Sequence, residues 1–235
     1  MGLRPPVTAV LFDMDGTLVE TEELWGEAMS ALARDLGGRL SAGARERTVG
    51  TSMRVAMTVL HADLGVDRSD EQLQRDARWV EDETAALMTS RGIPWRPGAR
   101  ELLTAVRAAG LATALVTTTP RRIAGIVLDR ITAKLGSSPF DVTVCGDEVP
   151  ARKPDPAPYR QAMAVLGVAP AGCVVVEDSL VGVTSGLTAG ATVLGVPSLQ
   201  PLEPRPGLVL CDSLLGVGVA DLVDLADQRL SGSRP

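Results

Sequence analysis

Short apolar runs alternate with helical patterns over most of this chain. The runs are rich in Val or Ala, as expected for strands buried on both faces. The predicted strands are residues 7–12, 111–116, 142–145, 173–176 and 192–196, with a weaker one at 208–210. Between them, apolar residues at helical spacing predict helices that stop at Gly110, Leu135, Gly167 and Gly190. This alternation predicts an α/β fold with a Rossmann-like, doubly wound parallel sheet.

One long segment, residues 20–93, departs from this alternation because it contains no convincing strand. Three apolar stripes at helical spacing predict three helices, which carry residues 24–36, 53–64 and 73–87. The segment is either additional scaffold or a lid, and its position directly after the first strand favours a lid over the end of the sheet.

We predict that the two flanks of this helical insertion are hinges. They comprise residues 17–21 and residues 91–98, and the second flank holds two prolines and two glycines. We therefore expect an α/β core domain of residues 1–17 and 97–235 and a helical cap domain of residues 18–96. Residues 197–206 are predicted to form a surface loop, and residues 231–235 a frayed tail.

Composition narrows the possible partners. The chain has 235 residues, of which 45% are hydrophobic and only 3% aromatic, so we expect a core of Ala, Val, Leu and Ile. A net charge of -6 without a basic stripe argues against nucleic acid as a partner. No apolar run reaches membrane-spanning length and no signal-peptide pattern is present, so we expect a cytoplasmic protein without a membrane partner.

The cysteines and the single histidine exclude two kinds of site. Cys145, Cys173 and Cys211 are widely spaced, and we expect reduced, mostly buried thiols. A zinc site is disfavoured because there is no CxxC pair and His61 is the only histidine. The same scarcity disfavours a Ser-His-Asp triad, and we expect His61 at the surface or at a helix end.

Two carboxylates, Asp13 and Asp15, follow the first predicted strand at a Gly-containing turn. Ligands of open α/β sheets bind just beyond the carboxyl ends of the strands. Side chains at i and i+2 of an extended segment face the same side, so both carboxylates can point into one cavity. One can then attack a substrate while the other moves a proton. The alternative is a solvated turn, for which Asp and Gly are ordinary residues.

Complementary groups follow three further strands. They are Thr117 with its neighbours 118–119, then Lys153, and then the pair Glu177 and Asp178. Each has a plain alternative: a helix cap, a solvated loop charge and ordinary turn residues. Taken together they favour chemistry, because acidic groups that meet a Lys and a Thr suit a phosphate with Mg²⁺, which prefers oxygen ligands.

At these residues the chain resembles the haloacid dehalogenase-like hydrolase superfamily. It looks most like the small-molecule phosphatases and β-phosphoglucomutase-like proteins, in which a helical cap is inserted after the first strand. Residues 13–17, Asp-Met-Asp-Gly-Thr, match the DxDGT motif, and Thr117 matches the Ser/Thr after the second strand. Lys153-Pro154 matches the Lys-Pro motif, and Glu177-Asp178-Ser179 the last acidic motif. The resemblance covers nearly the whole chain, and the ordered set of four motifs is highly specific.

The resemblance implies a chemical role for each acidic residue. Asp13 would attack phosphorus and form an aspartyl-phosphate. Asp15 would protonate the leaving alcohol and then deprotonate the water that hydrolyses the intermediate. Mg²⁺ would be held by Asp178, by an oxygen of Asp13 and by the backbone carbonyl of Asp15, with a contribution from Glu177.

The resemblance also implies a set of phosphate-binding groups. Thr117 and Lys153 would bind the phosphoryl oxygens, and Lys153 would also offset the crowded carboxylates. Backbone N–H groups near Gly16 and Thr118 would add donors. Phosphoryl transfer depends mainly on positioning and charge stabilisation, and this set supplies both.

Three activities remain open within this resemblance. Asp15 favours a phosphatase over a dehalogenase, because a departing halide needs no acid. The alternative is a phosphomutase similar to β-phosphoglucomutase, although this chain has Trp25 where those mutases carry a cap histidine. It also has no Lys before residue 134 for a second phosphate, a role that Arg54 or Arg47 could take. A non-catalytic protein that binds a phosphorylated ligand is disfavoured because every matching catalytic position is filled.

Substrate choice should depend on cap side chains that close over the leaving group. The candidates are Trp25, Thr48, Gly50, Ser52, Arg54, Trp79 and Trp95. Trp25 either packs on a sugar face or lies in the core, and Arg54 either clamps a second anion or is a solvated helix residue. We expect a small phosphorylated metabolite such as a sugar phosphate, bound by a monomer.

Overall fold

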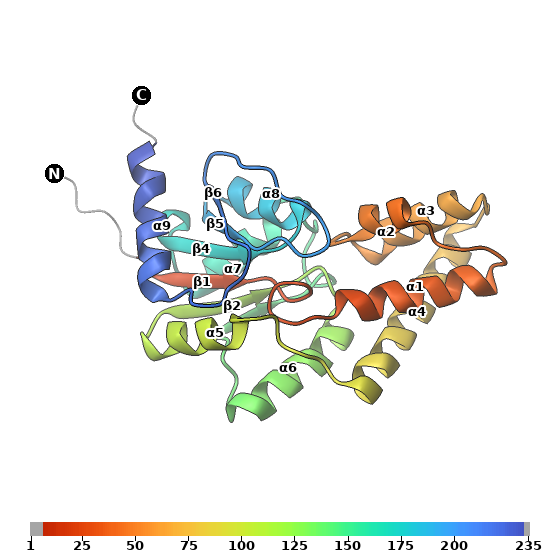
Figure 1. The fold of residues 1–235 in the computed structure, drawn as a ribbon, viewed down its shortest axis with the longest axis horizontal. Helices are drawn as coiled ribbons and strands as arrows, with labels where there is room; N and C mark the ends of the chain where they lie inside the picture. Colours follow the sequence, from red (N-terminus) through yellow and green to blue (C-terminus); the bar gives the residue numbers. More distant parts are fainter. Residues whose placement is uncertain (1–6, 233–235) are drawn as a thin grey trace.

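A single parallel sheet forms the body of the protein (Figure 1). The computed structural model describes residues 7–232. Within them the strands are β1 (Ala9–Phe12), β2 (Ala112–Val116), β3 (Val142–Val144), β4 (Cys173–Glu177), β5 (Thr192–Gly195) and β6 (Leu208–Leu210). Neighbouring strands are all parallel, in the order β3-β2-β1-β4-β5-β6. The predicted α/β fold is confirmed, with each strand within two residues of its predicted place.

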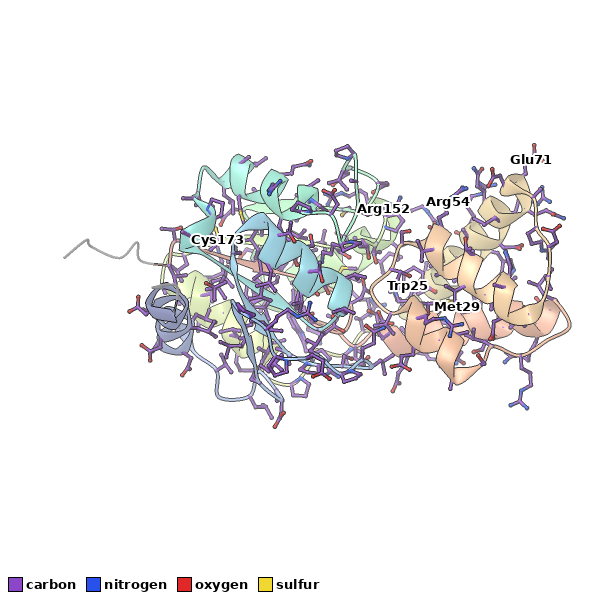
Figure 2. All side chains as sticks on the ribbon, turned by 90° about the horizontal axis from the view of Figure 1, so that it is seen from above. Trp25, Met29, Arg54, Glu71, Arg152 and Cys173 are labelled. Atoms are coloured by element: carbon purple, nitrogen blue, oxygen red, sulfur yellow. The ribbon has the colours of Figure 1, made fainter. Side chains whose placement is uncertain are left out.

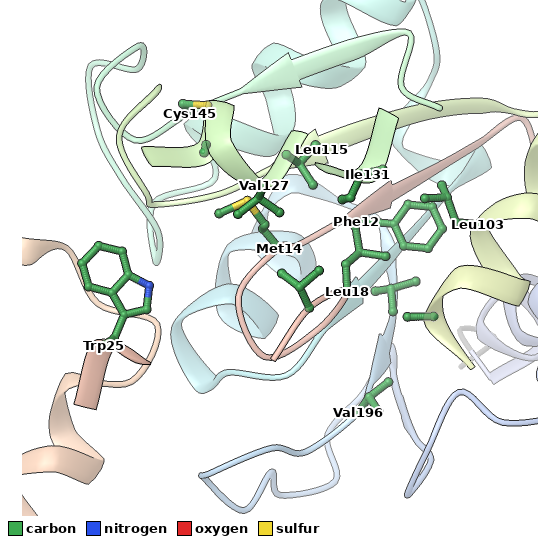
Figure 3. Packing of buried hydrophobic residues seen from close by; sticks show 14 of the residues in the cluster. Phe12, Met14, Leu18, Trp25, Leu103, Leu115, Val127, Ile131, Cys145 and Val196 are labelled. Carbon is green, nitrogen blue, oxygen red and sulfur yellow. The ribbon is translucent and has the colours of Figure 1, made fainter. Parts of the chain in front are cut away.

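Helices cover both faces of the sheet, which explains why its strands are apolar at every position. Val10 and Phe12 of β1 belong to one apolar cluster, whereas Ala9 and Leu11 belong to the other. The first cluster includes side chains of α5 (Ala99–Ala108), α6 (Arg121–Leu135) and α9 (Val219–Gly232); part of it is shown in Figure 3. The second includes α7 (Ala157–Leu166) and α8 (Leu180–Ala189).

The C-terminal helix differs from the sequence-based expectation. No helix was predicted after residue 210, but α9 packs Leu222 and Leu225 against the sheet. It also includes residues 231–232 of the predicted tail, and residues 233–235 lie outside the described part of the chain.

A unit of four helices lies beside the sheet (Figure 1). It consists of α1 (Glu22–Asp35), α2 (Ala42–Thr48), α3 (Met53–Leu64) and α4 (Asp70–Arg91). Three of these helices match the predicted stripes. The sequence analysis missed α2 because its seven residues, Ala-Gly-Ala-Arg-Glu-Arg-Thr, carry no apolar stripe. The side chain of Ser41 begins this short helix by accepting a hydrogen bond from the backbone N–H of Ala44.

His61 was predicted at the surface or in a capping role at a helix end; it lies in the last turn of α3, but the prediction of a surface position is wrong. It is only 4% exposed, because it falls on the same face of α3 as Met57, one turn earlier. Its Nε2 lies 2.9 Å from a carboxylate oxygen of Asp76 on α4. Burial lowers the pKa of His61, while the Asp76 carboxylate opposes that shift. The residue therefore ties α3 to α4.

The two segments that connect the four-helix unit to the sheet lie side by side. Val19 and Trp95 form an antiparallel bridge. An ion pair of 2.5 Å between Arg96 and Glu20 holds the same two segments together. These are the segments predicted as hinges, so any movement of the helical unit has to pass through this paired connection.

Two further observations bear on the expected environment. All three cysteines carry free thiols, with Cys145 and Cys173 buried as predicted and Cys211 half-buried. Among the described residues, no helix combines the length and apolar character needed to cross a membrane.

Candidate active site

The candidate active site lies at the carboxyl ends of β1 and β4, where the strand order reverses. The chain runs outward from β1 through β2 to β3, and then returns to place β4 on the other side of β1. Ligands of open α/β sheets bind in the crevice at such a reversal. Asp13 directly follows β1 and Asp178 directly follows β4, and both are buried. The sheet thus brings together two acidic residues that are far apart in sequence.

Lys153 joins these carboxylates from the loop between β3 and α7. Its ammonium nitrogen lies 2.6 Å from Oδ1 of Asp13 and 2.6 Å from Oε1 of Glu177. It also donates to the backbone carbonyl of Val116 at 2.8 Å. Burial alone lowers the pKa of Lys153, but the attraction of the two carboxylates outweighs burial, so the pKa is raised above its ordinary value. The site therefore retains a buried positive charge.

Glu177 is fully buried and holds Lys153 in place. Its Oε1 accepts hydrogen bonds from Lys153 and, at 2.7 Å, from the hydroxyl of Tyr159. Its Oε2 accepts from the hydroxyl of Ser179 at 3.2 Å. Gly182 leaves room for this carboxylate, since a Cβ at that position would lie 1.9 Å from Oε1. The predicted contribution of Glu177 to a metal site therefore competes with three donors already in place.

A metal ion fits the acidic residues at this point. Asp13, Glu177 and Asp178 each offer an oxygen, and these oxygens lie within 4.8 Å of one another. Oδ1 of Asp178 accepts from the hydroxyl of Thr17 at 3.1 Å, whereas Oδ2 is buried without a hydrogen-bond partner among the described residues. An unpaired buried oxygen is costly, so a cation is the group expected to face it.

Gly16 provides the space beside that unpaired oxygen. Its φ of +83° favours glycine, and a Cβ built there would lie 2.2 Å from Oδ2 of Asp178. Backbone N–H groups near Gly16 were predicted to help bind phosphate. The N–H of Gly16 itself donates to the carbonyl of Val19 at 2.8 Å and closes the turn, so this position contributes space.

Crowding of the carboxylates shifts their protonation. Burial, and next the charge of Glu177, raises the pKa of Asp13 from 3.8 to about 8, against the opposing effect of Lys153. Burial, followed by the charges of Asp13 and Glu177, also raises the pKa of Asp178 well above its ordinary value. A bound cation would offset this repulsion, which is a second reason why the residues fit a metal.

Asp15 is held by groups from the hinge, the cap and the loop after β2. Its Oδ1 accepts hydrogen bonds from the hydroxyl of Thr21 and, at 3.2 Å, from the indole Nε1 of Trp25. Its Oδ2 accepts from the hydroxyl of Thr119 at 2.7 Å and is 3.4 Å from that of Thr117. The carboxyl group is therefore fixed by four donors, two of which move with any displacement of the helical unit.

Trp25 lies in the core, as one of its two interpretations predicted, and also at the pocket; packing on a sugar face stays a prediction. It belongs to the large apolar cluster and is 7% exposed, and it also lines the pocket that contains Asp13. Figure 3 shows its indole nitrogen turned toward the sheet, apart from the other labelled apolar side chains. Figure 2 places Trp25 and Met29 at the end of the helical unit that faces the sheet domain, with Glu71 at the far end. Trp25 thus connects the cap to the site.

A small pocket lies between the sheet and the helical unit. Its volume is about 50 Å³, enough for only a few water molecules. Gly50 brings the loop between α2 and α3 against the sheet domain, since a Cβ there would lie 2.6 Å from Oγ of Ser179. The loop between α2 and α3 therefore lies directly over this end of the sheet.

The structure brings only some of the predicted cap residues to this pocket. Trp25, Thr48 and Gly50 line it together with Thr118 of the β2 loop. The remaining predicted residues are absent from the lining: Ser52, Arg54, Trp79 and Trp95. The Arg54 side chain is 60% exposed and pairs with Asp70 at 2.9 Å.

Two charged residues of the pocket were not among the predicted site residues. Glu22 and Arg45 line the pocket and form an ion pair of 2.5 Å between α1 and α2. They are 23 residues apart in the chain, and no spacing signal indicates that they meet. Only the tertiary structure brings them together.

The arrangement can carry out phosphoryl transfer. It combines a buried carboxylate at Asp13, a second carboxyl at Asp15, a fixed ammonium at Lys153 and oxygens suited to a cation. Positioned charges of this kind stabilise the negative charge spread over a transferring phosphoryl group.

Comparison with known proteins also indicates a hydrolase. Residues 7–190 match the haloacid dehalogenase-like hydrolase family. The chain is 32% identical over 195 residues to Protein CbbY of Rhodobacter capsulatus, covering 81% of this chain and 85% of that protein. It is 35% identical over 182 residues to a phosphorylated carbohydrates phosphatase of Thermotoga maritima, covering 77% of this chain and 81% of that protein.

Comparison with a solved structure shows that the similarity also holds for the fold. The fold is similar to that of CbbY from Rhodobacter sphaeroides, crystallised in complex with xylulose-(1,5)bisphosphate. The TM-score is 0.80 at 29% identity, over 92% of this chain and 99% of that one. The similarity includes both the sheet and the inserted helices.

Proposed function

The chain belongs to the haloacid dehalogenase-like hydrolase family, and from this membership we propose that it is a magnesium-dependent phosphatase of sugar phosphates or similar small phosphomonoesters. The observation that carries the proposal is the position of Lys153, which bonds to Asp13 while Glu177 fixes it from behind. Asp15, two residues after Asp13, supplies the acid that an alcohol leaving group needs.

The first step is the transfer of the phosphoryl group to the protein. An oxygen of Asp13 attacks phosphorus, and the bond between phosphorus and the ester oxygen breaks. Asp15 gives its proton to the departing alcohol oxygen. Lys153 and the hydroxyl of Thr117 bind phosphoryl oxygens, and the N–H of Thr118 adds a donor. The product of this step is an aspartyl-phosphate at Asp13.

The second step returns the site to its starting state. The Asp15 carboxylate takes a proton from a water molecule, whose oxygen attacks the phosphorus of the aspartyl-phosphate. The bond between phosphorus and Asp13 breaks, and inorganic phosphate leaves. The same carboxyl group thus acts first as an acid and then as a base, which requires that it reach both the ester oxygen and the attacking water.

We assign the metal site to Asp13, Asp178 and the backbone carbonyl of Asp15. Mg²⁺ held there would neutralise charge on the phosphoryl oxygens and orient them toward Asp13. The bonds that Glu177 already accepts from Lys153, Tyr159 and Ser179 support a role as the anchor of Lys153.

We further propose that residues 18–96 form a cap domain that opens and closes over a core of residues 1–17 and 97–235. The paired connection between Val19 and Trp95 and the small volume of the pocket support this division. We propose that the protein acts as a monomer. Buried, unpaired Cys145 and Cys173 suit the reducing cytoplasm.

A phosphatase fits the cap better than a phosphomutase does. A mutase must hold a second phosphate of its bisphosphate intermediate, yet the predicted candidate Arg54 pairs with Asp70 outside the pocket. The cap also contains no Lys. Trp25 places an indole N–H, which cannot accept a proton, beside Asp15.

Phosphate release from a panel of small phosphomonoesters tests the proposal, with Mg²⁺ or with EDTA. The panel includes p-nitrophenyl phosphate, glycerol 3-phosphate, glucose 6-phosphate and 2-phosphoglycolate. We expect release that requires both Mg²⁺ and an intact Asp13. No release of phosphate from any ester by the folded protein would contradict it, and conversion of glucose 1-phosphate to glucose 6-phosphate would establish the mutase instead.

A further inference from the structure

Opposite the reacting groups, the cap presents a single charged pair to the substrate. Glu22 begins α1 and Arg45 lies in α2, and both line the pocket that contains Asp13 and Asp15. The Glu22 side chain is 7% exposed and that of Arg45 is 17% exposed. A charged pair buried this deeply in a pocket wall must be matched by whatever part of the substrate lies against it.

The pair is built into the cap by several bonds. One guanidinium nitrogen of Arg45 donates to Oε2 of Glu22 at 2.5 Å and to the backbone carbonyl of Glu22 at 2.6 Å. The other donates to the hydroxyl of Thr48 at 3.0 Å. Gly26 of α1 leaves room for the side chain, since a Cβ there would lie 2.7 Å from Nε of Arg45. The guanidinium is therefore fixed, not mobile.

The charges of the pair cancel, and this decides which ligand it suits. Arg45 is already neutralised by Glu22, so it offers little net attraction to a second anionic group. The carboxylate of Glu22 would also repel a phosphate or carboxylate placed beside it. Burial raises the pKa of Glu22, and the charge of Arg45 opposes that shift.

The pair instead suits alcohol hydroxyl groups. A hydroxyl both donates and accepts, so it can give its proton to the carboxylate and accept one from the guanidinium. The three bonds within the cap use both N–H groups of one terminal nitrogen of Arg45 and one of the other, and Nε lies against Gly26, so one terminal N–H group remains for a ligand. Arg45 bonds to Oε2 only, so Oε1 remains to accept from a hydroxyl.

We propose that the Glu22–Arg45 pair selects monophosphates whose remaining part is an uncharged polyol and rejects substrates with a second anionic group. This inference rests on the proposed phosphatase function and narrows its substrate class. Bisphosphates and phosphorylated carboxylic acids are then poor substrates, and phosphorylated sugars or sugar alcohols with one phosphate are good ones. Glu22 acts here as a specificity residue that contacts the leaving group.

Matched substrate pairs test the proposal. Glycerol 3-phosphate and 3-phosphoglycerate differ by one hydroxymethyl group against one carboxylate, and glucose 6-phosphate and glucose 1,6-bisphosphate differ by one phosphate. We expect kcat/KM to favour the member with one anionic group by at least about tenfold, the effect of one like-charge contact. Affinities of the same compounds for Asp13→Asn, measured by calorimetry, give the same preference without turnover.

The variant Glu22→Gln tests whether the substrate preference depends on the charge of Glu22. It keeps the size of the side chain but leaves the charge of Arg45 without its partner. The ratio of kcat/KM between the two substrates of each matched pair should therefore become smaller or reverse. Glu23→Gln is the control, because Glu23 is exposed on the same helical turn and lies outside the pocket lining. Each ratio is measured within one preparation, so partial loss of folded protein cancels.

Two results would overturn the proposal. One is a wild-type protein that hydrolyses or binds the doubly anionic members as well as the others. The other is an unchanged ratio in Glu22→Gln. Failure of the phosphatase function has a different signature, since no ester would then be hydrolysed, and the calorimetric affinities would still decide the preference.

Discussion

The indole Nε1 of Trp25 donates a hydrogen bond of 3.2 Å to Oδ1 of Asp15, so the helical unit contacts the residue that we propose as the acid and base. In the proposed mechanism, closure of the cap over a substrate and placement of Asp15 would be coupled through this bond. Cap closure in this protein would do more than exclude water, because it would also complete the set of donors around Asp15.

Replacement of Trp25 by Phe should lower kcat by about ten- to a hundredfold, because a hydrogen bond to a carboxylate contributes about 1.5–3 kcal/mol. KM should change little, since the aromatic ring that lines the pocket is kept. Steady-state kinetics with p-nitrophenyl phosphate and with glucose 6-phosphate measure both constants. Trp79→Phe is the control, as Trp79 is 37% exposed and outside the pocket lining. A kcat equal to that of the control would show that the bond does not position Asp15.

Gly50→Ala should impair closure of the cap. A Cβ at Gly50 would lie 2.6 Å from Oγ of Ser179, and its φ of +68° also disfavours alanine. Gly65 has a nearly identical φ of +66° with nothing within 4 Å of a Cβ, so Gly65→Ala carries the backbone strain alone. We expect kcat/KM to fall about tenfold or more in Gly50→Ala and to stay within about twofold in Gly65→Ala. Equal losses in the two variants would assign the effect to strain.

Lys153→Met should abolish activity and weaken the fold. The substitution leaves the buried carboxylates of Asp13 and Glu177 without their shared cation, which typically costs about 3–5 kcal/mol of unfolding free energy. Lys134, the other lysine of the chain, is exposed, so Lys134→Met should change that energy by less than about 0.5 kcal/mol. Urea denaturation in EDTA provides the comparison, and similar values for the two variants would contradict the role of Lys153.

The raised pKa of Asp13 predicts a pH dependence of the metal-free protein. Its pKa in the folded state is about 8, against 3.8 for the ordinary group, so its contribution to stability is complete below about pH 4 and is lost as the pH rises toward 8. The variant Asp13→Asn has no carboxyl group at this position, so its unfolding free energy should not fall for this reason. In EDTA, wild type should therefore lose unfolding free energy relative to Asp13→Asn across this range.

Mg²⁺ should act in the opposite direction, because it binds the ionised form of Asp13. The stabilisation of wild type by Mg²⁺ should thus increase as the pH rises over the same range. Urea denaturation at several pH values, with EDTA and with Mg²⁺, measures both effects. A difference between wild type and Asp13→Asn that does not vary with pH would contradict the electrostatic account of the site.

Much of the fold and of the reacting centre could be predicted from the sequence. Strands buried on both faces leave continuous apolar runs, and the chemistry of a parallel sheet gathers where such runs end. Asp13, Thr117, Lys153 and Asp178 each lie at or soon after such an end, so local patterns were sufficient to group them. The short helix α2 was missed because it carries no apolar stripe. The helix α9 was also missed, although Val219, Leu222 and Ala226 follow helical spacing.

The wall of the pocket could not be predicted, because it depends on contacts between helices. Arg54 was a candidate by its position on a helix, but packing pairs it with Asp70 and brings Arg45 to the pocket instead. The burial of His61 likewise follows from its partner Asp76 on α4, which no spacing rule identifies. Side chains that meet across helices need the folded structure.

The central claim is that Asp13 carries the phosphoryl group. Acetyl phosphate has a leaving group that needs no acid, so it can phosphorylate Asp13 in an Asp15→Asn variant that lacks the base for hydrolysis. With Mg²⁺, intact-protein mass spectrometry should show the gain of one phosphoryl group by Asp15→Asn, located at Asp13 by peptide mapping. No gain should occur in the variant that also carries Asp13→Asn. An equal gain in that double variant, or a phosphoryl group mapped to another residue, would contradict the account.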